Sequence, residues 1–164
     1  MKPPTRYSLC ACVIGLLFSA LPAFADFSGK VIDVVDGDTI TMWHKNRKEK
    51  VRLNGIHCPE KGQVFGREAQ RFTSFMVLSR YVTVKIVGKD KHGRTLGDVI
   101  LPDGRVLNRE LLKEGLAWWY RQDSSDQSLG ELEDLARAEK RGLWADPHPI
   151  PPWEWKKLRR QRKG

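Results

Sequence analysis

The chain has 164 residues, of which 40% are hydrophobic and 30% are charged, and its formal net charge is +9. This composition is that of a globular protein and excludes a disordered chain, a collagen-like repeat and a protein with several membrane spans. The positive charge favours a polyanionic partner, namely nucleic acid, an anionic membrane surface or an acidic polysaccharide, without choosing among them.

The first 25 residues have the pattern of a secretory signal peptide. Lys2 and Arg6 precede a mostly apolar run over residues 8–21, and Ala23 and Ala25 are the small residues that a signal peptidase recognises. The apolar run is shorter than the roughly 20 residues that span a bilayer. Cleavage after Ala25 would leave one periplasmic or secreted domain with no stable membrane association. A retained signal anchor is the alternative.

Five short segments rich in β-branched residues are predicted to be strands. Between the first two, Asp36-Gly37 is among the strongest sequence signals for a hairpin. Pro59 ends the region of the third strand, and Gly104 marks a turn after the fifth. The predicted strands are residues 29–35, 40–43, 51–56, 81–87 and 95–101.

Three segments have the spacing or the end signals of helices. Asn108 can cap a short helix that ends at Gly115, and Ser128 with Glu131 forms a capping box for a helix that ends at Gly142. The first helix falls between the third and fourth strands, and its apolar face consists of Phe65, Ala69, Phe72 and Met76.

This order of elements predicts a mainly β fold with α-helices: a five-stranded Greek-key barrel of the OB type with about three helices packed outside. A parallel α/β sheet is disfavoured, because strands and helices do not alternate along the chain. Residues 148–164 contain prolines, tryptophans and then many basic residues, and we interpret them as a basic tail.

The predicted hairpin carries acidic residues that could bind a metal. Asp36 and Asp38, together with Thr39, offer oxygen ligands to a hard cation such as Ca²⁺. The alternative is that Asp36-Gly37 simply forms the turn.

Arg52, Glu60 and Arg94 are charges in places where the predicted fold does not require them. A guanidinium binds a phosphate through two parallel hydrogen bonds, and a carboxylate can take a proton from water. Two arginines aimed at phosphoryl oxygens would stabilise the charge that develops when a phosphodiester is cleaved. The structural alternatives are an arginine at a strand edge, a glutamate at a helix start and a solvated turn over residues 90–94.

The segments around Asp38, around Arg52 and Glu60, and around Arg94 follow one another in an order and at intervals that resemble the staphylococcal nuclease (thermonuclease) family. The matching segments read VDGDTI, VRLNGIHCPEKGQVFG, DKHGRTLG, VLNRELLKEGLAWWYR and EKRGLWADP. The resemblance covers residues 27–147 and defines a predicted nuclease domain over residues 26–147. It implies an OB-fold barrel with three helices and Ca²⁺-dependent endonuclease activity on both DNA and RNA.

The resemblance also implies roles for individual residues. Arg52 and Arg94 would hold the phosphoryl oxygens, and Glu60 would be the general base that activates water. The metal would be held by the carboxylate of Asp38 and by the backbone carbonyl of Thr39.

One position departs from the family pattern: His57 stands where the family has an aspartate that ligates the metal, while Asp36 remains as a neighbouring acid. Ca²⁺ prefers oxygen ligands, whereas imidazole suits transition metals. We therefore expect either a weakened Ca²⁺ site, with water or a nearby acid in the gap, or a metal such as Mn²⁺ or Zn²⁺. Metal-independent activity is a further alternative, with a protonated His57 in place of the cation.

Trp119, Tyr120 and Arg121 fall where the family's substrate-stacking tyrosines begin, and Lys91 lies in the basic turn before Arg94. We expect these residues to bind nucleic acid, because an aromatic face can stack on a base without reading its sequence. The alternative for a tryptophan of this segment is that it closes the barrel against the last helix.

The prediction is an exported, monomeric nuclease that hydrolyses DNA and RNA. The rival hypothesis is a catalytically weak OB-fold module that binds nucleic acid or another polyanion. The complete set of Arg52, Glu60 and Arg94 favours the nuclease, because a binding module has no use for a carboxylate that repels phosphate. His57 is the feature that favours the binding module.

Overall fold

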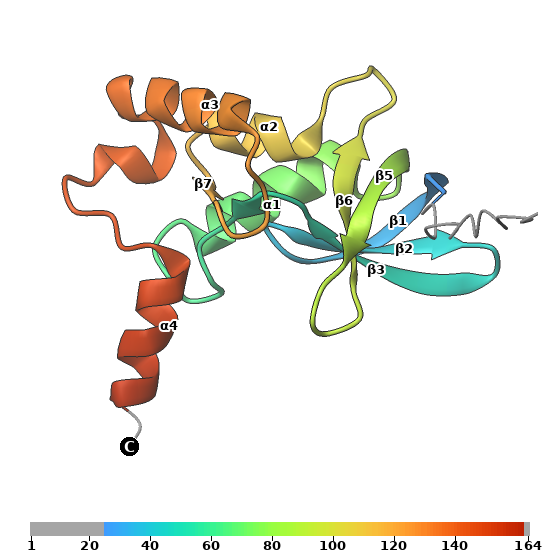
Figure 1. Ribbon diagram of the computed structural model, residues 1–164, viewed down its shortest axis with the longest axis horizontal. Coiled ribbons are helices and arrows are strands. Elements are labelled where there is room, and N and C mark those ends of the chain that lie inside the picture. Colours follow the sequence, from blue (N-terminus) through green and yellow to red (C-terminus); the bar gives the residue numbers. More distant parts are fainter. Residues whose placement is uncertain (1–24, 163–164) are drawn as a thin grey trace, which may run out of the picture.

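The computed structural model of the protein describes residues 25–162 (Figure 1). Nearly all of the predicted signal peptide therefore lies outside the described residues. Five strands form a closed barrel in the order β1-β2-β3-β6-β5, which confirms the predicted barrel. These strands are β1 (Phe27–Asp36), β2 (Thr39–His44), β3 (Arg47–Leu53), β5 (Tyr81–Lys89) and β6 (Thr95–Ile100).

The β1–β2 hairpin forms where the Asp-Gly signal predicts it. Asp36 lies opposite Thr39, so the connecting loop consists of Gly37 and Asp38. Only glycine fits at the tip, because a Cβ on Gly37 would lie 2.8 Å from the Cβ and Sγ of Cys58. The tip is thus packed against the loop that follows β3, and this close approach fixes the position of Asp38.

Two pairings between distant parts of the sequence close the barrel. β1 pairs antiparallel with β5, and Phe27 lies opposite Val84. β3 pairs parallel with β6, and Arg52 lies opposite Leu96. The parallel pair places Arg52 beside the start of the strand that follows Arg94. Closure of the barrel therefore brings two arginines that are far apart in the sequence to the same end of the sheet.

Helices lie to one side of the barrel in the described part of the chain (Figure 1). They are α1 (Gly66–Val77), α2 (Leu107–Lys113), α3 (Gln127–Ala138), the 3₁₀ helix η1 (Gly142–Ala145) and α4 (Pro152–Gln161). A two-stranded sheet pairs β4 (Ile56–His57) with β7 (Trp118–Trp119). The sequence pattern predicted α1, α2 and α3. It did not predict α4, which lies within the segment interpreted above as a basic tail and projects from the body of the domain.

The helix caps differ from the prediction. Asn108 lies inside α2 and caps nothing; its side chain accepts a hydrogen bond from the N–H of Val99 (3.1 Å) and donates one to the carbonyl of Asn54 (2.9 Å). Asp126 caps α3 by accepting a hydrogen bond from the N–H of Ser128 (3.0 Å). Asn108 thus ties α2 to β6 and to the loop after β3, instead of ending a helix.

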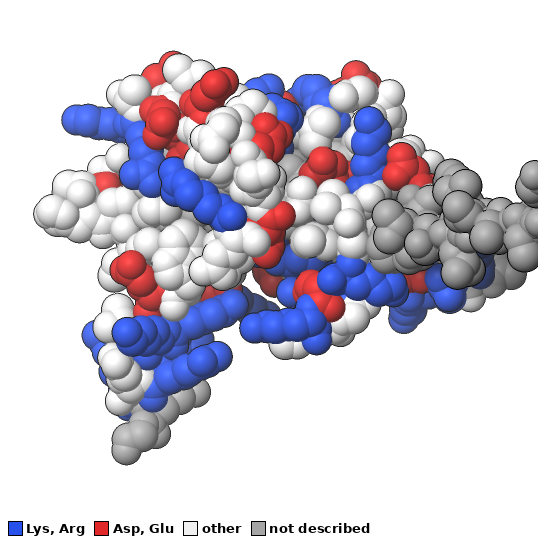
Figure 2. Space-filling model, in the orientation of Figure 1, with Lys and Arg blue, Asp and Glu red and all other residues white. Residues whose placement is uncertain are grey.

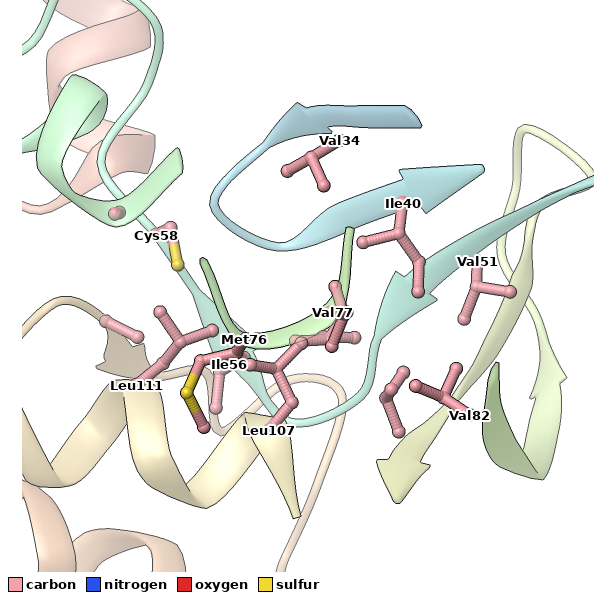
Figure 3. Packing of buried hydrophobic residues seen from close by; sticks show 14 of the residues in the cluster. Val34, Ile40, Val51, Ile56, Cys58, Met76, Val77, Val82, Leu107 and Leu111 are labelled. Carbon is pink, nitrogen blue, oxygen red and sulfur yellow. The ribbon is translucent and has the colours of Figure 1, made fainter. Parts of the chain in front are cut away.

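The hydrophobic core fills the barrel and continues beneath α1 and α2 (Figure 3). Its fully buried members include Val31, Ile40, Val51, Val84, Leu107 and Leu111. Burial of each such side chain contributes roughly 1.5–3 kcal/mol, so the core can hold the domain together without a disulfide. Cys58 is the free cysteine of the described residues, and it too is buried. No helix between residues 25 and 162 has both the length and the apolar character needed to cross a membrane.

Candidate active site

A buried ion pair lies at the centre of the candidate site. The Nη1 of Arg52 is 2.9 Å from the Oδ1 of Asp38, and only 7% of each side chain is exposed. The second carboxylate oxygen of Asp38 accepts a hydrogen bond from the N–H of Cys58 (2.6 Å). The Nη2 of Arg52 donates to the carbonyl of Ile56 (2.9 Å). The pair therefore joins the hairpin tip, β3, β4 and the start of the loop after β4 in one rigid arrangement.

Asp36 brings a second carboxylate to the same hairpin. Its Oδ1 accepts a hydrogen bond from the N–H of Asp38 (3.2 Å). Burial, together with the neighbouring charge of Asp38, raises the pKa of Asp36 to about 7. Two carboxylates that resist simultaneous ionisation form a site where a bound cation would relieve the repulsion.

Arg94 reaches the hairpin from the β5–β6 turn. Its Nη1 donates to the Oγ1 of Thr39 (3.3 Å), and its Nε lies 2.6 Å from the Oδ2 of Asp90. Asp90 also accepts hydrogen bonds from the backbone N–H groups of Arg94 (3.0 Å) and His92 (2.8 Å), which fold the turn. The Nη2 of Arg94 has no hydrogen-bond partner within residues 25–162, so it can receive a ligand.

Thr39 contacts the site through its hydroxyl. The Oγ1 accepts from Arg94 and lies 3.3 Å from the Oδ1 of Asp38, to which it donates. The backbone of Thr39 is part of the sheet, opposite Asp36 on one side and Arg52 on the other. The predicted role of its carbonyl as a metal ligand therefore gains no support from the geometry.

Glu60 follows Pro59 in the loop between β4 and α1. Its Oε1 lies 3.2 Å from the Nε2 of His57 and 2.6 Å from the Nζ of Lys156. Partial burial alone would raise the pKa of Glu60, but hydrogen bonds from His57 and Lys156 lower it to about 2. The carboxylate is therefore ionised at neutral pH and is held by two partners.

His57 is turned toward Glu60 and toward aromatic rings. It lies in β4, opposite Trp118 of β7. Its ring meets the Tyr120 ring edge-on, with 5.3 Å between the centroids. The Nδ1 of His57 is buried and has no hydrogen-bond partner in the described structure. Within residues 25–162, no three His, Cys, Asp or Glu side chains are grouped as metal ligands.

The predicted nucleic-acid-binding residues differ in accessibility. Trp119 is only 6% exposed and belongs to the core, where its Nε1 donates to the carbonyl of Ser124 (3.2 Å). The guanidinium of Arg121 covers the Trp119 ring at 4.1 Å from its centroid. Tyr120 is half-buried and Lys91 is exposed. Base stacking by Trp119 therefore conflicts with its burial, whereas Tyr120, Arg121 and Lys91 are accessible.

Two residues at the site were missed from the sequence, and both come from α4. Lys156 forms the ion pair with Glu60, and the Trp153 ring packs near the His57 ring at 6.1 Å between centroids. Pro152 at the start of α4 is a helix-start signal that could have been used. Trp153, Lys156 and Arg160 also share one helix face, at intervals of three and four residues.

We expect Arg52→Met to lower the free energy of unfolding by about 3 kcal/mol or more, because it leaves the buried charge of Asp38 unpaired. Arg94→Met is the matched control. Its ion pair with Asp90 is more exposed, at 29% for the Arg94 side chain, so its loss should cost about 1 kcal/mol or less. Urea denaturation measures both values. Equal losses would contradict the structural role of Arg52.

Comparison with known proteins identifies the family. Residues 50–146 match the staphylococcal nuclease homologue family. An uncharacterized endonuclease of Escherichia coli is 40% identical over 140 residues, which cover 85% of this chain and 92% of the relative. Protein ParB of Escherichia coli is 36% identical over 163 residues, with 93% and 92% of the two chains covered. Micrococcal nuclease of Shigella flexneri is 36% identical over 152 residues, 87% of each chain. The chain therefore belongs to the staphylococcal nuclease family and is a nuclease that hydrolyses phosphodiester bonds.

Proposed function

We propose that the protein is an exported, sugar-nonspecific endonuclease that cleaves DNA and RNA with the help of a divalent cation. The observation that carries this proposal is that two of the predicted catalytic residues contact one acidic hairpin, and the third follows the segment that this hairpin holds. Arg52 pairs with Asp38, Arg94 donates to Thr39, and Glu60 follows the segment that Asp38 holds through the N–H of Cys58. These groups act on phosphorus and its oxygens, which DNA and RNA share. The signal-peptide pattern of the first 25 residues supports export.

Hydrolysis requires a proton acceptor and stabilisation of the charge on the phosphoryl oxygens. Glu60 takes a proton from a water molecule as the water oxygen attacks phosphorus. The bond from phosphorus to the departing oxygen breaks, and this oxygen leaves with the bonding electron pair and takes a proton from solvent. Arg52 and Arg94 donate hydrogen bonds to the phosphoryl oxygens, on which negative charge grows in the transition state.

The two arginines differ in how firmly the protein holds their guanidinium groups in place. Arg52 is fixed by Asp38 and Ile56 before substrate arrives, so little reorganisation is needed when charge develops. Arg94 is fixed at Nε by Asp90, and its Nη2 points a free donor group at an incoming phosphate. A planar guanidinium held at one edge presents its other edge in a defined direction.

A divalent cation fits the acidic hairpin better than it fits His57. The carboxylates of Asp36 and Asp38 would hold it, because hard cations prefer oxygen ligands and the two charges oppose each other in a buried place. His57 is directed toward Glu60, so its imidazole is engaged elsewhere. When bound, the cation would supply positive charge that offsets the negative charge of the phosphate.

The alternative function, a catalytically weak module that binds nucleic acid, is favoured by one observation. Against the effect of partial burial, hydrogen bonds from His57 and Lys156 lower the pKa of the proposed base to about 2, and such a carboxylate is a weak proton acceptor. The two functions differ in what happens to the substrate. Cleavage that depends on Glu60 supports the nuclease mechanism, and binding without cleavage supports the module.

Asp36→Asn tests the acidic pair. Because the pKa of Asp36 is about 7 in the folded protein and near 4 in an unfolded chain, its ionisation costs stability as pH rises from about 4 to about 7. At pH 8 in EDTA, we expect the variant to be more stable than wild type by about 1–2 kcal/mol, with no difference near pH 4. Ca²⁺ should raise the melting temperature of wild type more than that of the variant.

Asp38→Asn is the control for this experiment and should change stability in the opposite direction, because it removes the partner of buried Arg52. Thermal unfolding near pH 4 and at pH 8 measures the stability of wild type, Asp36→Asn and Asp38→Asn. If Asp36→Asn were less stable than wild type at pH 8 in EDTA, the proposed repulsion between the two carboxylates would be refuted.

Glu60→Gln should lower turnover by about 10²-fold or more, since general-base catalysis is typically worth 10² to 10⁴. Its affinity for single-stranded DNA, measured by fluorescence anisotropy in EDTA, should stay close to that of wild type. Glu68→Gln is the matched control, because Glu68 is an exposed acid in the first turn of α1. Cleavage by the Glu60 variant at the rate of wild type would exclude Glu60 as the base.

His57→Asp should raise Ca²⁺-dependent cleavage about tenfold, because it adds an anionic oxygen near the hairpin. His57→Asn is the control that removes the imidazole without adding charge. In wild type, we expect EDTA to abolish cleavage, and Ca²⁺ or Mn²⁺, which bind oxygen ligands, to restore it better than Zn²⁺. Full activity of wild type after exhaustive metal removal would contradict the metal requirement.

A further inference from the structure

The residues just before and within the first turns of α4 lie against the loop that carries Glu60. We call residues 150–156 the strap. Gln63 fastens the strap to the loop: its Oε1 accepts from the N–H of Glu60 (3.0 Å), and its Nε2 donates to the carbonyl of Ile150 (2.6 Å). The start of α4 is therefore held at the candidate site.

A lysine of the strap forms an ion pair with Glu60, the proposed general base. The Nζ of Lys156 lies 2.6 Å from the Oε1 of Glu60, the same oxygen that His57 contacts. A lysine at this position competes with a water molecule for the carboxylate.

The strap also covers an aromatic surface. The Trp153 ring lies 5.5 Å from the Tyr120 ring and 5.8 Å from the Trp118 ring, measured between centroids. Tyr120 is the accessible aromatic residue of the predicted base-stacking segment. A nucleobase that stacks on the side of Tyr120 next to Trp153 must therefore take the place of the Trp153 ring, which is itself 38% exposed.

The rest of α4 carries positive charge that the domain does not neutralise. Lys157, Arg160 and Arg162 are exposed and form no ion pair with the residues the structure describes. In Figure 2, Lys and Arg side chains over α4 and others over the β5–β6 turn lie on either side of a hollow in the surface. A nucleic-acid strand that crosses this hollow can contact the site and α4 together.

We propose that Trp153 and Lys156 make the nuclease selective for long strands, by blocking Tyr120 and Glu60 until a strand that also contacts the basic residues of α4 displaces the strap. This inference rests on the proposed roles of Glu60 and Tyr120. A di- or trinucleotide reaches only the blocked site and must displace the strap unaided. A long strand gains contacts to α4 and releases counterions, which compensates for the lost strap contacts.

The strength of the block can be bounded. The Lys156–Glu60 pair is partly exposed, at 45% and 27% of the two side chains, and exposed ion pairs are weak. Aromatic contacts of Trp153 add a comparable amount. Together they should penalise a short substrate roughly tenfold, an amount that a few phosphate contacts can overcome.

The experiment compares kcat/KM per cleavable bond for a fluorescein-labelled trithymidylate and for a 60-nucleotide single strand, with the full chain and its variants. We expect Lys156→Met to raise kcat/KM for the trinucleotide about threefold, which is its share of the block, and to change the value for the long strand less than about 1.5-fold. Lys157→Met is the matched control: it removes the same charge one residue further along α4, has no contact with Glu60, and should give no gain with the trinucleotide.

A second measurement follows the strap directly. Tryptophan emission is recorded for Arg94→Met and for Arg94→Met with Trp153→Phe, and the difference between the two spectra is the emission of Trp153. This emission should shift to longer wavelength with the 60-nucleotide strand and stay unchanged with the trinucleotide. The proposal is overturned if Lys156→Met keeps the length preference of wild type, or if it lowers cleavage of both substrates, which would make Lys156 a positioning residue for Glu60. Wild-type rates in Glu60→Gln would instead overturn the proposed catalytic role of Glu60.

Discussion

The buried ion pair between Arg52 and Asp38 is the interaction on which the rest of the site depends. Neither charge could remain in this place alone, because an unpaired buried charge is strongly destabilising. The hydrogen bonds to Cys58 and Ile56 complete the arrangement and hold the loop that leads to Glu60. The same two side chains thus hold the hairpin tip, β3 and β4 together, and the catalytic role proposed for Arg52 would place a second constraint on the pair.

Local patterns were enough to predict the barrel. Alternating β-branched residues and the Asp-Gly turn act over a few positions, and the β1–β2 hairpin forms where they place it. The candidate site followed from the resemblance to the nuclease family, which the order and spacing of the motifs around Asp38, Arg52, Glu60 and Arg94 made recognisable. Their contacts could not be predicted, because the parallel pairing of β3 with β6 depends on closure of the whole barrel.

The burial of Trp119 and Tyr120 could not be predicted from the sequence. They are neighbours with similar aromatic character, yet one is in the core and the other is half-buried beside His57. The difference arises because β7 pairs with β4 and directs the Trp119 ring toward α3, where a Cβ on Gly130 would lie 2.6 Å from it. The packing of α4 against the site could not be predicted for a related reason. Its contacts to Glu60, Tyr120 and His57 join residues that are far apart in the sequence.

Cys58 illustrates how the same packing governs redox chemistry. Burial, together with the nearby charge of Asp38, raises the pKa of the Cys58 thiol well above its usual value. The thiolate is the form that attacks disulfides and oxidants, and it is therefore essentially absent. Cys58 is the one cysteine of residues 25–162, and a cysteine that reaches solvent as a thiolate can form mixed disulfides and covalent dimers. Here the hairpin tip at Gly37 covers the sulfur, so Cys58 is protected from oxidation and from disulfide exchange while the domain stays folded.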